Sequence, residues 1–193
     1  GNYIVRVQIA RNGEEFFLDD RYEMVESHQW PGKFNTTEGK TSYSITTDAK
    51  DGLMVQVNKT SMQLSFFRNG NSAWILKDND GIQWDGDKIR SSFAFDSNEH
   101  FTGLGHGYYG REESIDLGGK IVSRNYGTEH GQQAPLIVPF YLSNKGYGVF
   151  LNSTFPNQFN FGKNGLYEFS ITGNGRMDYF VILGPDFSKI IDR

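Results

Sequence analysis

Short stretches in which apolar and polar residues alternate one by one run along most of this chain, and they constrain its fold more than any other feature. In residues 3–10, Val5 and Val7 fall in one register, whereas Arg6 and Gln8 fall in the other. A period of two places alternate side chains on opposite faces of a β-strand. The same pattern recurs in residues 43–46, 53–57, 62–66, 72–76, 89–95, 135–142, 147–151, 166–171 and 177–183. The chain is therefore predicted to consist mainly of half-buried strands.

Asn-Gly and Asp-Gly pairs mark the intervals between these strands. They lie at residues 12–13, 51–52, 69–70, 80–81 and 85–86. Glycine at such positions supplies the positive φ that tight hairpins require. A content of 15% aromatic residues and 23 glycines favours the same fold class. We expect an all-β, antiparallel β-sandwich, with residues 1–193 forming a single domain.

The last residues are the one segment whose pattern favours a helix. Residues 185–193 begin with a proline, which is followed at once by Asp186, and both are typical of a helix start. No glycine or other stop signal follows Arg193. We therefore expect a short C-terminal helix and a natural chain that continues beyond residue 193.

Charge and composition argue against several classes of function. The net charge of -4 and the pI near 5.6 provide no basic surface for a nucleic acid. No apolar run is long enough to cross a membrane. The chain lacks cysteine, and its four histidines show no zinc spacing, so no metal or cofactor is expected. Absence of cysteine is compatible with a cytoplasmic, periplasmic or secreted location.

Three ordered motifs occupy the second half of the chain. They are Phe-Thr-Gly-Leu-Gly-His at residues 101–106, a Pro-Phe strand followed by a Gly-Tyr-Gly hairpin at residues 137–152, and a strand ending in Gly-Pro at residues 177–185. In this order they resemble the aromatic and Gly-Leu-Gly turn, the hairpin and the exit strand of the N-terminal domain of glycoside hydrolase family 31 enzymes, the α-glucosidase and α-xylosidase family, with His106 where the family usually has Glu. The resemblance covers most of the chain and is weakest before residue 60.

This resemblance implies a galactose-mutarotase-like β-sandwich, or supersandwich, that packs on a downstream (β/α)8 barrel. In that family both catalytic carboxylates are barrel aspartates, as retaining hydrolysis of an α-linked glycoside requires a nucleophile and an acid. We therefore expect no catalytic residue in these 193 residues, although the parent protein would be a glycoside hydrolase acting on an α-linked oligosaccharide. The acids here, including Asp78 and Asp80, are expected to be solvated and to have ordinary pKa values.

A polar loop is the candidate for contact with substrate. Residues 123–133 form an uninterrupted polar stretch between apolar strands, rich in planar side chains that can bond sugar hydroxyls. By position it corresponds to the family loop that reaches the barrel entrance. The candidate residues are Arg124, Asn125, Glu129 and His130.

Two other functions fit the same pattern. A free-standing carbohydrate-binding module would use aromatic residues such as Trp74 or Trp84 to stack on sugars, although core packing explains these residues equally well. A mutarotase-like isomerase would use a histidine and a carboxylate for acid-base work on an anomeric hydroxyl. An accessory domain, by contrast, is expected to expose an apolar patch where the barrel docks.

Overall fold

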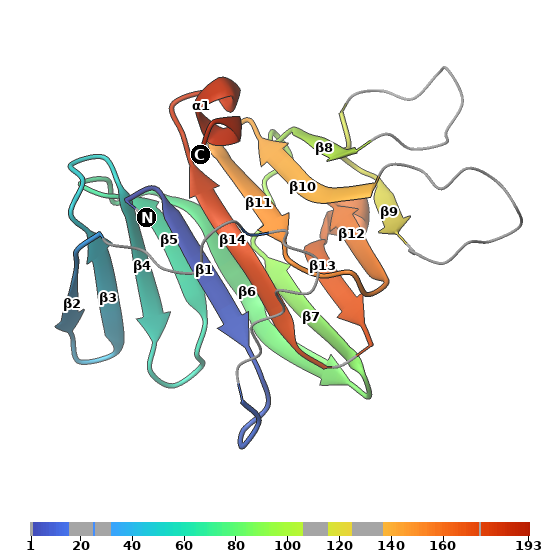
Figure 1. The fold of residues 1–193 in the computed structure, drawn as a ribbon, viewed down its shortest axis with the longest axis horizontal. Coiled ribbons are helices and arrows are strands. Elements are labelled where there is room, and N and C mark those ends of the chain that lie inside the picture. The colour runs from blue at the N-terminus through green and yellow to red at the C-terminus, as the bar shows by residue number, and fades with distance from the viewer. Residues whose placement is uncertain (1, 16–24, 26–31, 106–115, 125–136, 174) are drawn as a thin grey trace, which may run out of the picture.

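The computed structural model describes residues 2–15, 25, 32–105, 116–124, 137–173 and 175–193, and these form the expected antiparallel β-sandwich (Figure 1). The five-stranded sheet has the order β1 (Ile4–Ile9), β14 (Met177–Leu183), β11 (Tyr147–Leu151), β10 (Ile137–Ser143) and β8 (Phe101–Gly105). The nine-stranded sheet has the order β2 (Phe34–Glu38), β3 (Ser42–Thr47), β4 (Leu53–Asn58), β5 (Leu64–Arg68), β6 (Trp74–Asp85), β7 (Lys88–Phe93), β13 (Tyr167–Thr172), β12 (Asn157–Phe161) and β9 (Ile121–Arg124).

Alternation along β14 shows why the sequence pattern encodes a two-layer fold. Tyr179, Val181 and Leu183 are fully buried between the sheets, whereas Phe180 and Ile182 on the opposite face are only half-buried. β14 lies between β1 and β11, so the last strand of the chain pairs with the first. Every sequence-predicted strand coincides with an observed one, although the bounds move by a few residues.

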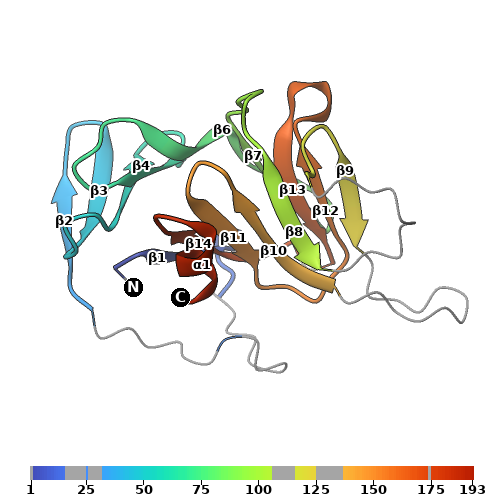
Figure 2. The same cartoon turned by 90° about the horizontal axis from the view of Figure 1, so that it is seen from above.

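The nine-stranded sheet is much wider than its partner, and β6 holds its two parts together. The first half of β6 pairs with β5 and the second half with β7, with a shift in register between Asp78 and Gly81. Residues 79–81 were expected to form a hairpin turn. They form a bulge within one long strand instead, although Gly81 does take the positive φ of 71°. Figure 2 shows that β2 and β3 of the nine-stranded sheet extend past β1, which is the edge strand of the smaller sheet.

The Gly-Leu-Gly motif also turns out to be strand rather than turn. Residues 103–105 lie in β8 and pair with β10 across an irregular register. A Cβ on Gly103 would come within 2.5 Å of the Phe140 carbonyl oxygen, and φ at this residue is 133°. Glycine is required here because the two backbones approach so closely.

Aromatic rings fill the space between the sheets. Phe101, Tyr141, Phe161 and Tyr167 contact one another with ring centroids 4.9 to 6.4 Å apart, in tilted, stacked and edge-on arrangements. Such geometry is favourable for aromatic pairs beyond the burial of area. Aromatic rings therefore pack closely where the middle of β10 faces β12 and β13.

The expected C-terminal helix is present as α1 (Phe187–Ile191), after a 3-10 turn (Lys163–Gly165) earlier in the chain. Asp186 caps it by accepting a 2.8 Å hydrogen bond from the Lys189 backbone N–H. Ile190 is buried, and a Cβ on Gly148 or Gly184 would lie 2.9 or 2.5 Å from its side chain. Gly148 and Gly184, which have no side chains, thus leave the space into which Ile190 of the helix packs.

Candidate functional site

The predicted substrate loop begins at the end of β9. Arg124 is the last residue of that strand and pairs with Asn157 of β12. Asn125, Glu129 and His130 lie outside the described residues. The next described strand, β10, begins at Ile137, which pairs with Gly105 of β8. Figures 1 and 2 both place β8, β9 and β10 at one end of the sandwich, so the candidate loop connects strands of the two sheets there.

The outer face of the five-stranded sheet carries a row of phenylalanines. Phe140, Phe150 and Phe180 are register partners on β10, β11 and β14, so their side chains lie on the same face. The Phe150 and Phe180 rings are 5.9 Å apart, and the Arg6 guanidinium of β1 lies 5.2 Å from the Phe180 ring. All three phenylalanines are only half-buried. We call this row the aromatic face.

Further apolar side chains extend the aromatic face. Phe187 and Ile191 of α1 are 40% and 64% exposed, and Val138 of β10 is 39% exposed. The helix sits at one end of the face, where Ile190 and the Phe140 ring both lie against Gly148. Large exposed apolar patches on soluble proteins often mark interaction sites. The sequence signal for this face was the presence of apolar residues in both registers of residues 137–142, 147–151 and 177–183.

Asp78 corrects one expectation from the sequence, because it is not a solvated surface acid. It is 1% exposed at the bulge of β6, and its Oδ2 accepts a 2.9 Å hydrogen bond from the Leu64 backbone N–H. Burial raises the pKa of Asp78 to about 7, and this effect outweighs the lowering by the Leu64 bond. Asp80, two residues on, is exposed as expected. Asp78 cannot reach a substrate because its carboxylate lies inside the sandwich.

Glu99 is a second buried acid, and its oxygens are already occupied. Oε1 accepts hydrogen bonds of 2.5 Å from Ser143 and 2.6 Å from Tyr147, and Oε2 lies 3.2 Å from the Lys145 ammonium. Tyr147 and Tyr141 continue the network to the Tyr167 hydroxyl at 3.0 and 2.5 Å. A catalytic carboxylate must touch the anomeric carbon or the leaving oxygen. The buried Glu99 therefore has a structural role.

His100 and Asp116 form the histidine and carboxylate pair that an isomerase would use. His100 Nδ1 lies 2.6 Å from Asp116 Oδ2, and both side chains are substantially exposed. Burial tends to raise the pKa of Asp116, but hydrogen bonds from the Gly118 N–H, from His100 and from the Phe101 N–H lower it overall. The carboxylate is thus ionised at neutral pH and accepts bonds from the backbone at the start of β8. This arrangement is that of a turn-stabilising residue.

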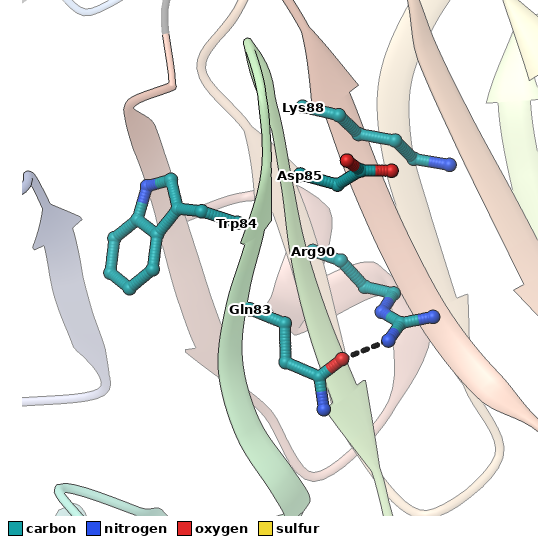
Figure 3. A pocket seen from close by; sticks show the side chains of 5 residues that line it. All are labelled: Gln83, Trp84, Asp85, Lys88 and Arg90. Carbon is teal, nitrogen blue, oxygen red and sulfur yellow. Dashed lines mark hydrogen bonds between the residues drawn. The ribbon is translucent and has the colours of Figure 1, made fainter.

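A shallow hollow lies on the hairpin that joins β6 to β7 (Figure 3). Gln83 faces Arg90 and Asp85 faces Lys88 across the two strands, and Figure 3 shows these four side chains on one side of the hairpin. Arg90 donates a hydrogen bond to Gln83. The hollow measures about 130 Å³. This volume is well below the roughly 300–1,000 Å³ of pockets that enclose a drug-sized ligand, so the hollow can hold the edge of one sugar at most.

The two described tryptophans are both held by neighbouring groups. Trp84, which points away from the polar side of the hairpin in Figure 3, is 38% exposed and donates a 2.7 Å hydrogen bond from Nε1 to the Gly175 carbonyl oxygen. The Lys145 ammonium lies 4.7 Å from the Trp74 ring centroid. A cation thus lies over the Trp74 ring, whereas the in-plane hydrogen bond of Trp84 fixes the orientation of that ring without covering its faces.

The part of the chain that the structure describes has neither a metal-binding cluster nor a membrane-spanning helix. Among the described residues, no three His, Asp or Glu side chains gather in a way that could hold a metal ion. Over the same part of the chain, no helix has both the length and the apolar character needed to span a membrane.

Comparison with known proteins gives a consistent set of relatives. Residues 1–160 match the family described as glycosyl hydrolase 31 N-terminal galactose mutarotase-like domain. An isomaltosyltransferase of Sporosarcina globispora is 24% identical over 188 residues, which cover 83% of this chain and 17% of the relative. A GH31 dextranase of Flavobacterium johnsoniae, solved in complex with isomaltotriose, superposes with a TM-score of 0.80 at 25% identity and covers 99% of this chain.

Solved structures with lower identity show the same fold. The cycloalternan-forming enzyme of Listeria monocytogenes, in complex with a pentasaccharide substrate, has a TM-score of 0.77 at 22% identity over 100% of this chain. The matched region is 24% of the dextranase chain and 18% of the cycloalternan-forming enzyme. This chain thus spans a quarter or less of the length of these relatives.

Proposed function

Because this chain belongs to the glycosyl hydrolase 31 N-terminal galactose mutarotase-like domain family, we propose that it is the non-catalytic N-terminal domain of a larger enzyme that acts on α-linked oligosaccharides. The aromatic face is the observation that carries the proposal. A half-exposed row of phenylalanines flanked by exposed helix residues is the surface that a docked catalytic domain would cover. The expected partner is a (β/α)8 barrel that follows this domain in the parent protein.

The burial of two acidic side chains supports the proposal that this domain is not catalytic. Retaining hydrolysis needs two accessible carboxyl groups about 5–5.5 Å apart on either side of the glycosidic bond. Asp78 and Glu99 are the two buried acids of the described residues, and both are enclosed by the sandwich. We therefore propose that the parent enzyme's reactive carboxylates belong to the barrel.

The substrate class is proposed from the relatives. The dextranase holds isomaltotriose, and the curated relative is an isomaltosyltransferase. We propose that the parent enzyme acts on α-linked glucose oligosaccharides of the isomaltose type, by hydrolysis or by glycosyl transfer. The 123–133 loop, with Arg124, Asn125, Glu129 and His130, is proposed to contribute to the substrate entrance because of its position between β9 and β10.

An activity comparison tests the accessory role. Residues 1–193 are expected to release no phenol from aryl α-glucosides or α-xylosides, whereas the parent enzyme turns over at least one of them. Turnover by residues 1–193 above the buffer rate rejects the proposal. Polarimetry on freshly dissolved α-glucose separates the isomerase alternative, because the accessory domain leaves the rate of mutarotation equal to that of buffer.

The entrance loop has its own test in the parent enzyme. Replacing Arg124 or His130 by alanine is expected to raise KM for isomalto-oligosaccharides while kcat for a short aryl α-glucoside stays unchanged, because only the longer substrate reaches the loop. Equal effects on both substrates would instead indicate damage to the fold or to the barrel.

Carbohydrate binding by the domain itself is the second candidate, and the hollow on the β6–β7 hairpin favours it. Asp85 and Lys88 face each other there without an ion pair within 4 Å, so both are available to sugar hydroxyls. Titration calorimetry of residues 1–193 with isomaltotriose, maltose and xylo-oligosaccharides distinguishes the two functions. Binding that Asp85→Ala abolishes supports a binding module, whereas absence of binding supports the accessory role alone.

A further inference from the structure

Asp78 occupies the place where the two parts of the nine-stranded sheet are joined. Strands β2 to β5 connect to the rest of that sheet through β6, which pairs with β5 up to Lys77 and with β7 from Asp78 onward, and the register shift of the β6–β7 pairing follows directly after Asp78. Within the sheet, Asp78 and this bulge therefore mark the joint between β2–β5 and the remaining strands.

Two hydrogen bonds tie the start of β5 to the bulge. The Leu64 N–H donates to Asp78 Oδ2 at 2.9 Å, and the Gln63 side chain donates to the Asn79 carbonyl oxygen at 2.6 Å. Gly81 lies beside the same turn, because a Cβ placed on it would be 3.7 Å from Gln63. Among the described residues, the carboxyl of Asp78 thus provides one of these two polar connections between the start of β5 and the bulge.

The other carboxyl oxygen of Asp78 is buried without a hydrogen-bond partner. Oδ1 is enclosed in the core, as are the hydroxyls of Ser91 on β7 and Tyr179 on β14. Burial raises the pKa of the Tyr179 hydroxyl, the Asp78 charge raises it further, and the Ser91 hydroxyl lowers it, so Tyr179 is the titratable group that faces Asp78. β5 brings the Leu64 N–H to Asp78, and among the described residues no cation forms an ion pair with Asp78. A negative charge in this position is therefore poorly compensated.

We propose that Asp78 makes this joint sensitive to pH: the neutral carboxyl keeps β5 attached to the bulge of β6, and loss of its proton favours a local opening that hydrates the carboxylate. The proposal goes beyond the accessory function and does not depend on it. It assigns a role to a buried acid that neither catalysis nor substrate binding uses.

The direction of the effect follows from linkage. In the open state Asp78 is hydrated and titrates near its ordinary value of 3.8, whereas in the closed state burial raises the pKa to about 7. The closed state binds more protons between these values, so the opening constant rises with pH by up to about tenfold per unit and levels off above pH 7.

Amide hydrogen exchange of residues 1–193 tests the proposal. After correction for intrinsic exchange rates, the opening constant of the β5 amides, Leu64 in particular, is expected to rise at least tenfold between pH 4.5 and pH 6.5. The amides of β12 and β13 are expected to have a much smaller opening constant than the β5 amides at every pH, because they exchange only through global unfolding. An opening constant of β5 that does not change over this range would overturn the proposal, as would equal opening constants in all three strands, which would indicate global unfolding only.

Two variants complete the experiment. Asp78→Asn keeps the shape and the acceptor for Leu64 but cannot ionise, so its β5 opening is expected to be independent of pH. Asp80→Asn changes an exposed acid on the same bulge and is expected to behave like the parent chain. If Asp78→Asn fails to fold, a pH titration of the Asp78 carboxyl carbon by NMR in the unaltered chain tests the proposal instead. A midpoint near 4 contradicts the proposal and a midpoint near 7 supports it.

Discussion

Arg6 and Asp178 form a two-point ion pair across the first and last strands of the sandwich. The guanidinium Nε and Nη2 donate to the two carboxylate oxygens at 2.9 and 2.5 Å, and both side chains are more than 80% buried. Asn152 of the neighbouring segment adds a 2.8 Å bond to the same carboxylate. Planar arginine–carboxylate pairs joined by two hydrogen bonds are among the stronger charged interactions in proteins.

Asp178→Asn is expected to lower the free energy of unfolding by about 2 kcal/mol, because the buried Arg6 loses its counter-charge. Urea denaturation at pH 7 measures the loss. The matched control is Asp192→Asn, which removes the exposed pair with Lys189, and its effect is expected to stay below about 0.5 kcal/mol. Equal losses in both variants would show that burial does not strengthen the Arg6 pair.

Glu99→Gln is expected to cost about 3 kcal/mol of folding free energy, because it leaves Lys145 without its buried partner and disturbs the tyrosine network. Asp96→Asn is the matched control. Asp96 lies 3.3 Å from the same ammonium but is 39% exposed, so its replacement is expected to have little effect. Chemical denaturation of the two variants compares them directly, and a larger loss in Asp96→Asn would contradict the assignment.

Gly148→Ala is expected to destabilise the domain by about 1–3 kcal/mol, because the new methyl group would lie 2.9 Å from both Ile190 and the Phe140 ring. The double variant with Ile190→Ala makes room for that methyl. Its loss should therefore be smaller than the sum of the two single losses, which a double-mutant cycle measures. Strict additivity would show that α1 does not pack on Gly148.

Stability is expected to fall as pH rises from about 4 to 7. The folded-state pKa of Asp78 lies near 7, whereas its ordinary value is 3.8. The free energy of unfolding therefore falls over this window by on the order of 4 kcal/mol at most. Below pH 4 the sign reverses, since Asp96 and Asp116 have lowered pKa values and their contribution is lost as they become protonated. Urea midpoints across pH 3–8 should show a maximum near pH 4 to 5, and Asp78→Asn should flatten the limb above it.

Phe187→Glu and Ile191→Glu are expected to reduce binding of an apolar fluorescent dye to residues 1–193 with little change in stability, about 0.5 kcal/mol or less, because both side chains are exposed here. In the parent enzyme the same changes should lower the temperature of inactivation by weakening domain docking. Leu166→Glu, at a site 45% exposed and away from the aromatic face, is the control and should affect neither measurement.

Alternation of residues predicted the strands that have one clearly apolar register. Residues 147–151 and 177–183 were predicted with the bounds that β11 and β14 have. β2, β9 and β12 were missed, since β12 reads Asn-Gln-Phe-Asn-Phe and asparagine has low strand propensity. The bulge at residues 79–81 and the strand at Gly103 were interpreted as turns, because glycine with positive φ serves both.

The candidate site was predicted less completely than the fold. Asp78 looked solvated because it stands among polar residues, and only the register with Phe93 on β7 turns it into the core. The aromatic face depends on Phe140, Phe150 and Phe180 becoming register partners, and sequence periodicity carries no information about which strands pair. The loop candidates from Asn125 to His130 remain a prediction.

The central place of β14 between β1 and β11 has a consequence for how this domain is made in the cell. Arg6 and Asp178 are 172 positions apart, so β1 leaves the ribosome long before β14, the strand with which it pairs, has been translated. During synthesis the nascent chain must hold an unfinished sheet with a gap beside β11, and nascent chains of this kind need protection from aggregation. Completion of the smaller sheet is therefore a late event that waits for translation of β14, residues 177–183.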